Sequence, residues 1–141
     1  LNDFFDSAID DSLVHLNVLG LSAVARYLEI PFKYHICSEL NLLLPEKMGP
    51  GEWALDICSL LGATTYVNPA GGQDIFDPTA FDQRGVSLQF AHSAEFIYNT
   101  SSYQYEPNLS ILDVLMWNPP SVVAEAVQNV MLAGHNDIAG S

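Results

Sequence analysis

Basic side chains are scarce in this 141-residue chain. Lys and Arg together number only 4, against 17 Asp and Glu, which gives a formal net charge of −13. Because binding to a phosphate backbone depends on Lys and Arg displacing counterions, this balance argues strongly against a nucleic-acid partner. It disfavours an anionic membrane surface for the same reason. The plain interpretation of the acidity is that it keeps the protein soluble.

Cysteines are few, and long apolar runs are missing. Cys37 and Cys58 form no CxxC pair and lie in apolar sequence, so we expect buried free thiols in a reducing cytoplasm. The longest apolar runs are far shorter than a membrane span, and no secretory signal is visible. The 4 histidines stand singly, without HxH or HExxH spacing. We therefore predict no metal site and no cofactor.

Apolar residues make up 49% of the chain, which is enough for a core. The spacing of these residues predicts helices over 4–28, 53–61, 78–84, 110–117 and 122–132, and strands over 32–37, 63–69 and 86–92. Gly20 is a candidate break in the first helix, and Gly62 and Gly85 are candidate stops.

Strands separated by helices indicate the α/β class, with a three-layer-like arrangement in which helices flank a short, mostly parallel sheet. We expect a single α/β domain over residues 1–132 and a frayed tail over residues 133–141.

The densest apolar stretch is PNLSILDVLMWNPP, residues 107–120, and it contains one charge, Asp113. Ser110 stands three residues earlier, so the two fit a capping box in which Ser110 caps a helix and Asp113 bonds back to the Ser110 N–H. A carboxylate there also faces the positive end of the helix dipole. The alternative is catalytic, because apolar surroundings can prepare a carboxylate to act as a base.

The stretch NPAGGQD, residues 68–74, directly follows a predicted strand. Gly71 and Gly72 permit positive φ and can leave backbone N–H groups free for an anion, so a ligand loop at the end of a parallel strand is one interpretation. An ordinary tight turn is the other, because neither GxGxxG nor a P-loop is present. Three acidic residues follow, and they are either a solvated loop or a Mg²⁺ site: Asp74, Asp77 and Asp82.

Two further stretches have a functional and a structural interpretation. In YNTSSYQYEP, residues 98–107, tyrosines beside Gln104 are typical of a surface that holds a sugar or a base, and equally of a loop pinned to the core. His35 and Cys37 would share one face of the predicted strand and could form an activated thiolate. Because nothing positions a third group, we interpret this pair as structural.

Two stretches together resemble the WbqC-like family: ALDICSLLGATTYVNPAGGQDIFDPTAFDQRGVSLQF and YQYEPNLSILDVLMWN. The residues that carry the resemblance are Leu61, Gly62, Ala63, Tyr66, Asn68, Gly71, Gly72, Phe76, Asp77, Phe81, Gly85, Tyr103, Pro107, Leu109, Ser110, Ile111, Leu112, Asp113 and Asn118. The register of Tyr103–Gln104 stays open, because the family has one residue between its Tyr and Gln. The family's opening motifs are not present, so we expect the C-terminal part of a WbqC-like protein.

The resemblance implies a bacterial, cytoplasmic protein of surface-polysaccharide (O-antigen, lipopolysaccharide) biosynthesis. The implied activity is an acyl- or aminoacyl-type transferase, and the implied partner is a sugar or sugar nucleotide that carries an amino group. The expected substrate-binding residues are Asn68, Gly71, Gly72, Tyr103, Gln104 and Asn118. Asp113 is the expected general base or orienting group. The alternative is a non-catalytic binding or assembly module of the same pathway, which the acidic surface and the lack of a strong catalytic motif favour.

Overall fold

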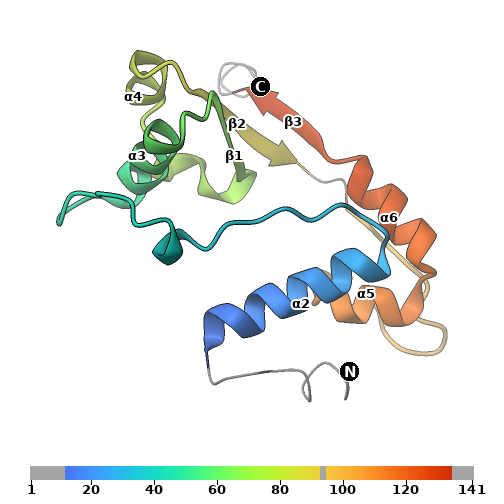
Figure 1. The fold of residues 1–141 in the computed structure, drawn as a ribbon. Coiled ribbons are helices and arrows are strands. Elements are labelled where there is room, and N and C mark those ends of the chain that lie inside the picture. Colours follow the sequence, from blue (N-terminus) through green and yellow to red (C-terminus); the bar gives the residue numbers. More distant parts are fainter. Residues whose placement is uncertain (1–11, 93–94, 135–141) are drawn as a thin grey trace. The chain divides into compact units, whose positions relative to one another are not determined.

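The computed structural model describes residues 12–92 and 95–134, and of residues 131–134 only the backbone (Figure 1). Its elements are α2 (Leu13–Tyr27), η1 (Cys37–Glu39), α3 (Pro50–Leu61), β1 (Thr65–Pro69), η2 (Ala70–Ile75), α4 (Pro78–Gln83), β2 (Ser87–His92), α5 (Ile111–Trp117), α6 (Pro120–Gln128) and β3 (Met131–Gly134), where η1 and η2 are 3₁₀ helices. Contacts group the chain into two compact units. The helical unit comprises Leu1–Tyr34 and Glu95–Gln128, and the sheet unit comprises His35–Ala94 and Asn129–Ser141. The expectation of a single domain over residues 1–132 stays a prediction.

The sheet has the strand order β1-β2-β3. β1 and β2 are parallel, with Tyr66 opposite Leu88 and Asn68 opposite Phe90. β3 pairs antiparallel to β2. Because side chains alternate along a strand, these four residues share one face of the sheet. The small α/β fold is confirmed, and so are the strands predicted over 63–69 and 86–92.

The core of the sheet unit lies on that face. Its buried residues come from α3, α4 and β2 and the turn before it: Leu55, Cys58, Phe81, Val86, Leu88 and Phe90. Helices α3 and α4 therefore both contribute to the face that carries Leu88 and Phe90. Cys58 is a buried free thiol, as expected, and burial raises its pKa. Cys37 is exposed, so its predicted burial is wrong.

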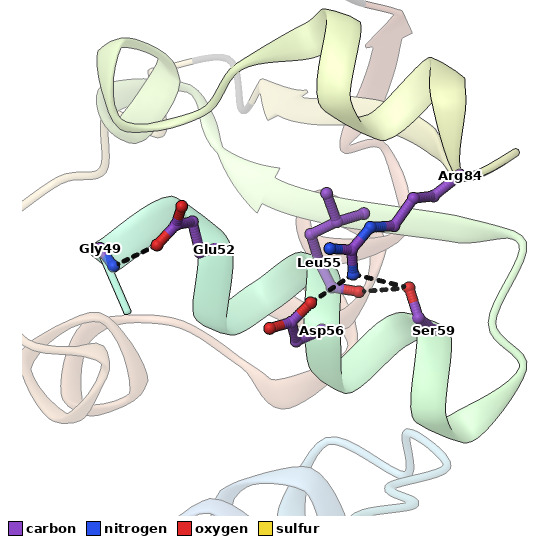
Figure 2. A network of polar contacts seen from close by, with 6 residues as sticks. All are labelled: Gly49, Glu52, Leu55, Asp56, Ser59 and Arg84. Carbon is purple, nitrogen blue, oxygen red and sulfur yellow. Dashed lines mark hydrogen bonds and ion pairs between the residues drawn. The ribbon is translucent and has the colours of Figure 1, made fainter. Parts of the chain in front are cut away.

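Local chemistry explains the ends of α3. Pro50 occupies the first turn, and the Gly49 N–H donates to Glu52 Oε2 at 2.6 Å (Figure 2). This is half of a capping box, since Gly49 has no side chain to complete it. Gly62 ends the helix with φ +66°, a left-handed conformation that glycine adopts at little cost, so the predicted stop is confirmed.

A surface ion pair joins α3 to the end of α4. Arg84 Nη1 donates to Asp56 Oδ1 and lies 3.4 Å from Ser59 Oγ, which in turn donates to the Leu55 carbonyl at 2.8 Å (Figure 2). The Arg84 side chain is 48% exposed, so solvent screens the pair and its contribution to stability is small.

The predicted helix over residues 4–28 is observed as α2. Its N-cap is Ser12, whose side chain accepts from the His15 N–H at 3.3 Å. The helix continues through Gly20, so the predicted break is wrong: a single interior glycine costs a helix only about 1 kcal/mol. Residues 4–11 of the prediction lie outside the described part of the chain.

Two other predicted elements differ from the structure. Residues 32–36 form neither a helix nor a strand, and η1 begins at Cys37. The last helix ends at Gln128 rather than at residue 132, and Met131–Gly134 forms β3. Residues 133 and 134 of the predicted tail therefore belong to the sheet, and residues 135–141 lie outside the described part of the chain.

Candidate functional site

The signature stretch begins α5, and its serine is the helix cap. Ser110 Oγ accepts from the Leu112 N–H at 3.2 Å, which confirms the predicted cap. Asp113 lies in the first turn, where the helix dipole favours a negative charge. Its carboxylate does not close a capping box with Ser110, so that part of the prediction is wrong. It has another partner.

Asp113 accepts a hydrogen bond from a tyrosine of the preceding loop. The Tyr98 hydroxyl donates to Asp113 Oδ2, and both side chains are partly buried. The hydrogen bond to Asp113 raises the pKa of Tyr98 to about 12, and desolvation and the charges of Asp113 and Tyr105 act in the same direction. Tyr98 therefore stays protonated at neutral pH and serves as a donor to the carboxylate.

The aromatic loop, defined here as residues 96–105, is held by its own side chains. The Tyr105 ring meets the Tyr98 ring edge-on, with centroids 5.2 Å apart, and its hydroxyl donates to the Phe96 carbonyl at 3.3 Å. Thr100 Oγ1 donates to the Tyr103 carbonyl at 2.7 Å. The conformation of the loop is thus fixed by these bonds.

The same loop contacts α5 at a second point. The ring centroids of Tyr103 and Trp117 are 5.9 Å apart. Trp117 comes four residues after Asp113, so the two side chains lie on one face of α5, one turn apart. Tyr98 and Tyr103 therefore meet the same helix face in succession, at Asp113 and at Trp117. The candidate site is this face of α5 together with the aromatic loop.

The remaining predicted residues of this unit differ in availability. Tyr103 is 71% exposed, and the neighbouring Gln104 is exposed too, so both can meet a ligand. Asn118 ends α5, and its Nδ2 donates to the Val114 carbonyl at 2.8 Å. One N–H of its amide therefore has a structural partner, which leaves the other N–H and the carbonyl oxygen for a ligand.

The predicted glycine loop lies in the sheet unit. Residues 70–75 form the 3₁₀ helix η2, and Gly71 and Gly72 do not use the positive φ that glycine permits. Asn68 precedes η2 on β1. Its Oδ1 accepts from the Tyr66 hydroxyl at 3.2 Å, and its Nδ2 donates to the Pro69 carbonyl at 3.0 Å. Gly72 packs directly against this amide.

The predicted site residues thus fall into two groups, one in each compact unit. Tyr103, Gln104, Asp113 and Asn118 lie on α5 and the loop before it, in the helical unit. Asn68, Gly71 and Gly72 lie at the end of β1 in the sheet unit. Each group is coherent by itself.

The other candidates have structural explanations. Asp77 caps α4, where its Oδ1 accepts from the Thr79 N–H at 3.0 Å. His35 and Cys37 are exposed and are not on a strand, which removes the basis for a paired thiolate. Among residues 12–92 and 95–134, no three His, Cys, Asp or Glu side chains come close enough to hold a metal ion.

One contact and one residue of interest were not predicted from the sequence. Tyr98 belongs to the tyrosine-rich stretch considered for a sugar or a base, but its bond to the Asp113 carboxylate joins residues 15 positions apart, so no local pattern indicates the contact. His92 ends β2, and its Nε2 is shielded from solvent without a hydrogen-bond partner among the described residues. The alternation of VSLQFAH places His92 on the same face as Leu88 and Phe90, and that signal could have singled it out.

Comparison with known proteins identifies the class. The model of the WbqC-like protein family matches residues 1–125. The chain therefore belongs to the WbqC-like protein family, as its two motifs indicated. No curated protein and no solved structure matches it significantly. In the part of the chain that the structure describes, no helix has the length and apolar character needed to cross a membrane.

Proposed function

We propose that this protein is a cytoplasmic enzyme of bacterial surface-polysaccharide biosynthesis that transfers an acyl or aminoacyl group to a nucleotide-linked amino sugar. The observation that carries the proposal is the face of α5, on which the Asp113 carboxylate lies one turn from the Tyr103–Trp117 aromatic pair. An exposed aromatic surface beside a carboxylate is typical of sites that bind sugars and bases. Membership of the WbqC-like family supports this pathway.

The proposed chemistry uses Asp113 as the general base. The amino group of the sugar attacks the carbonyl carbon of an activated acyl donor, so a C–N bond forms and the bond to the donor's leaving group breaks. The proton lost by the amine passes to the Asp113 carboxylate, and the leaving group departs with its electron pair. Tyr103 packs against the sugar or base, and Gln104 and Asn118 bond its polar groups.

The sheet unit contributes its own proposed contacts. Asn68 is partly buried near the end of β1, and Gly71, in η2, is exposed. A Cβ at Gly71 would meet nothing within 4 Å, so its backbone is accessible to a ligand. We assign Asn68, Gly71 and Gly72 to polar groups of a substrate, in keeping with the rule that α/β sheets bind ligands at the carboxyl ends of their strands.

A non-catalytic binding or assembly module is the second candidate. Its specific support is the apolar exposure of α5, where Met116 is 80% exposed and Leu112 is 45% exposed. Exposed apolar patches are typical of surfaces that bind other proteins. In that case Asp113 and Tyr98 would only fix the loop on the helix.

Measurements of ligand binding and of turnover distinguish the enzyme from the binding module. The probes are UDP-glucosamine as acceptor and acetyl coenzyme A as donor, with calorimetry for binding and thiol release for turnover. If the protein is the proposed enzyme, we expect the wild type to give both signals. Tyr103→Ala and Gln104→Ala should each bind UDP-glucosamine at least tenfold more weakly. Tyr27→Ala is the matched control, because Tyr27 is an exposed tyrosine of α2 in the same unit. Turnover that survives in a folded Asp113→Asn variant would remove the catalytic role.

A further inference from the structure

Tyr98 is the one side chain of the described residues that is hydrogen-bonded to the Asp113 carboxylate. Its hydroxyl engages Oδ2 alone. The tyrosine belongs to the aromatic loop, whereas Asp113 belongs to the first turn of α5, so the bond joins two segments 15 residues apart. Nothing in the capping of α5 requires it, because Ser110 already supplies the helix cap.

The Tyr98 ring is itself held in place. Tyr105 packs edge-on against it, at an interplanar angle of 83°, and Phe96 lies 5.9 Å away, centroid to centroid. The Tyr105 hydroxyl donates to the Phe96 backbone carbonyl, so the ring that packs against Tyr98 is itself held in place. A hydroxyl presented on a supported ring fixes the carboxylate in one rotamer, as a precise site requires.

We infer that Tyr98 is a positioning residue for Asp113: it occupies Oδ2 and leaves Oδ1 to accept the N–H or O–H group of a ligand. The inference rests on the proposed function, because it assigns the free oxygen to the amine of the acceptor. A carboxylate held at one oxygen presents its other oxygen in one direction. Without the hydroxyl the carboxylate rotates about a broad torsion and loses this direction. The raised pKa of Tyr98 is the effect that this hydrogen bond to a carboxylate has on the donor hydroxyl.

The first experiment tests the pair without any substrate. The full chain is labelled with ¹³C at the tyrosine ring carbon that bears oxygen, and the 6 tyrosines are titrated up to pH 11, with folding monitored by circular dichroism. The signal that Tyr98→Phe removes identifies Tyr98, and this tyrosine should stay protonated at pH 11; it is assigned in this way because burial also raises the pKa of Tyr66. Asp113→Asn should make that tyrosine titrate with the others, since the charge that stabilises its proton is gone. Tyr27→Phe is the control and should leave the late signal in place. A Tyr98 signal that still titrates late in Asp113→Asn overturns the pairing.

The second experiment tests positioning with UDP-glucosamine and acetyl coenzyme A. Tyr98→Phe keeps the ring and its packing, so we expect kcat to fall about tenfold or more while KM changes less than about threefold. Tyr27→Phe should match the wild type. A folded Tyr98→Phe variant with wild-type kcat overturns the positioning role and leaves the proposed function standing. A wild type that turns over no acyl acceptor overturns the proposed function, and the role of Tyr98 in it fails at the same time.

Discussion

Gly72 lies directly against the side-chain amide of Asn68, so that a Cβ at Gly72 would come within 2.3 Å of Asn68 Nδ2. The amide is held there by the Tyr66 hydroxyl and by the Pro69 carbonyl. The glycine is thus required by the close approach of a side chain and not by an unusual backbone conformation.

We expect Gly72→Ala to lower the free energy of unfolding by about 1–2 kcal/mol, because the methyl group displaces the Asn68 amide from its two hydrogen bonds. Gly71→Ala is the matched control. A Cβ at Gly71 meets nothing within 4 Å, so this variant should be neutral or slightly stabilised. Urea denaturation of both variants measures the difference, and equal stabilities would contradict the packing of Gly72 on Asn68.

We expect substitution of Gly51, in the first turn of α3, to have a larger effect on stability. A Cβ there would lie 2.4 Å from the backbone carbonyl oxygen of Ile75, which cannot move aside as a side-chain end can. Gly51→Ala should therefore lower the free energy of unfolding by about 2–3 kcal/mol, at the upper end of the range for overpacking. Thermal unfolding compares it with Gly71→Ala. A gain in stability, as a solvent-exposed helix position would give, is the contrary outcome.

Loss of the α5 cap is the third prediction. Ser110→Ala removes the hydroxyl that accepts from the Leu112 N–H and should cost about 1 kcal/mol. Ser121→Ala, an exposed serine in the first turn of α6, should change stability by less than about 0.5 kcal/mol. Chemical denaturation of the two variants decides the matter, and a neutral Ser110→Ala would show that α5 forms without its cap.

Stability at high pH follows from Tyr98. Its pKa in the folded protein is about 12, above the usual value of 10.0, so the folded state holds this proton more tightly than the unfolded state. The stabilisation is complete below pH 10 and is lost as the pH rises from 10 to 12. The unfolding midpoint of the wild type should therefore fall more steeply across this window than that of Tyr98→Phe. Parallel curves for the two proteins would contradict the linkage.

Much of the sheet unit could be predicted from local sequence. β1 is predicted by its β-branched residues and ends at Pro69, β2 alternates apolar and polar residues, and Gly62 and Gly85 end their helices with φ of +66° and +68°. These signals are local, so they do not depend on the rest of the fold. The segment 32–37 alternates in the same way yet forms no strand, because a strand also needs a neighbour that supplies hydrogen bonds. Its rings stack on each other instead, with the Phe32 and Tyr34 centroids 5.4 Å apart.

The site was less predictable, for a related reason. Ser110 could be identified as a cap because its partner is two residues away. Asp113 could be singled out as an isolated charge. Its partner Tyr98, however, is distant in sequence, and the path of the aromatic loop brings the two together. The strand β3 was not predicted, because a short apolar run such as VMLAG fits the end of a helix as well as a strand. Interactions between distant segments were therefore the part that local patterns could not supply.

Each of the two units is built from two separate segments of the chain, and this has a consequence for folding during synthesis on the ribosome. Residues 95–128, which include α5 and α6, lie in the chain between β2 and β3 and belong to the other unit. Once β2 has emerged from the ribosome, it can pair in parallel with β1. The other edge of β2 has no partner until some forty further residues, up to β3, have emerged. We therefore expect the third strand to add last. During that interval the β2 edge is open, and a chaperone that covers unpaired strand edges would have its best opportunity to act on this protein.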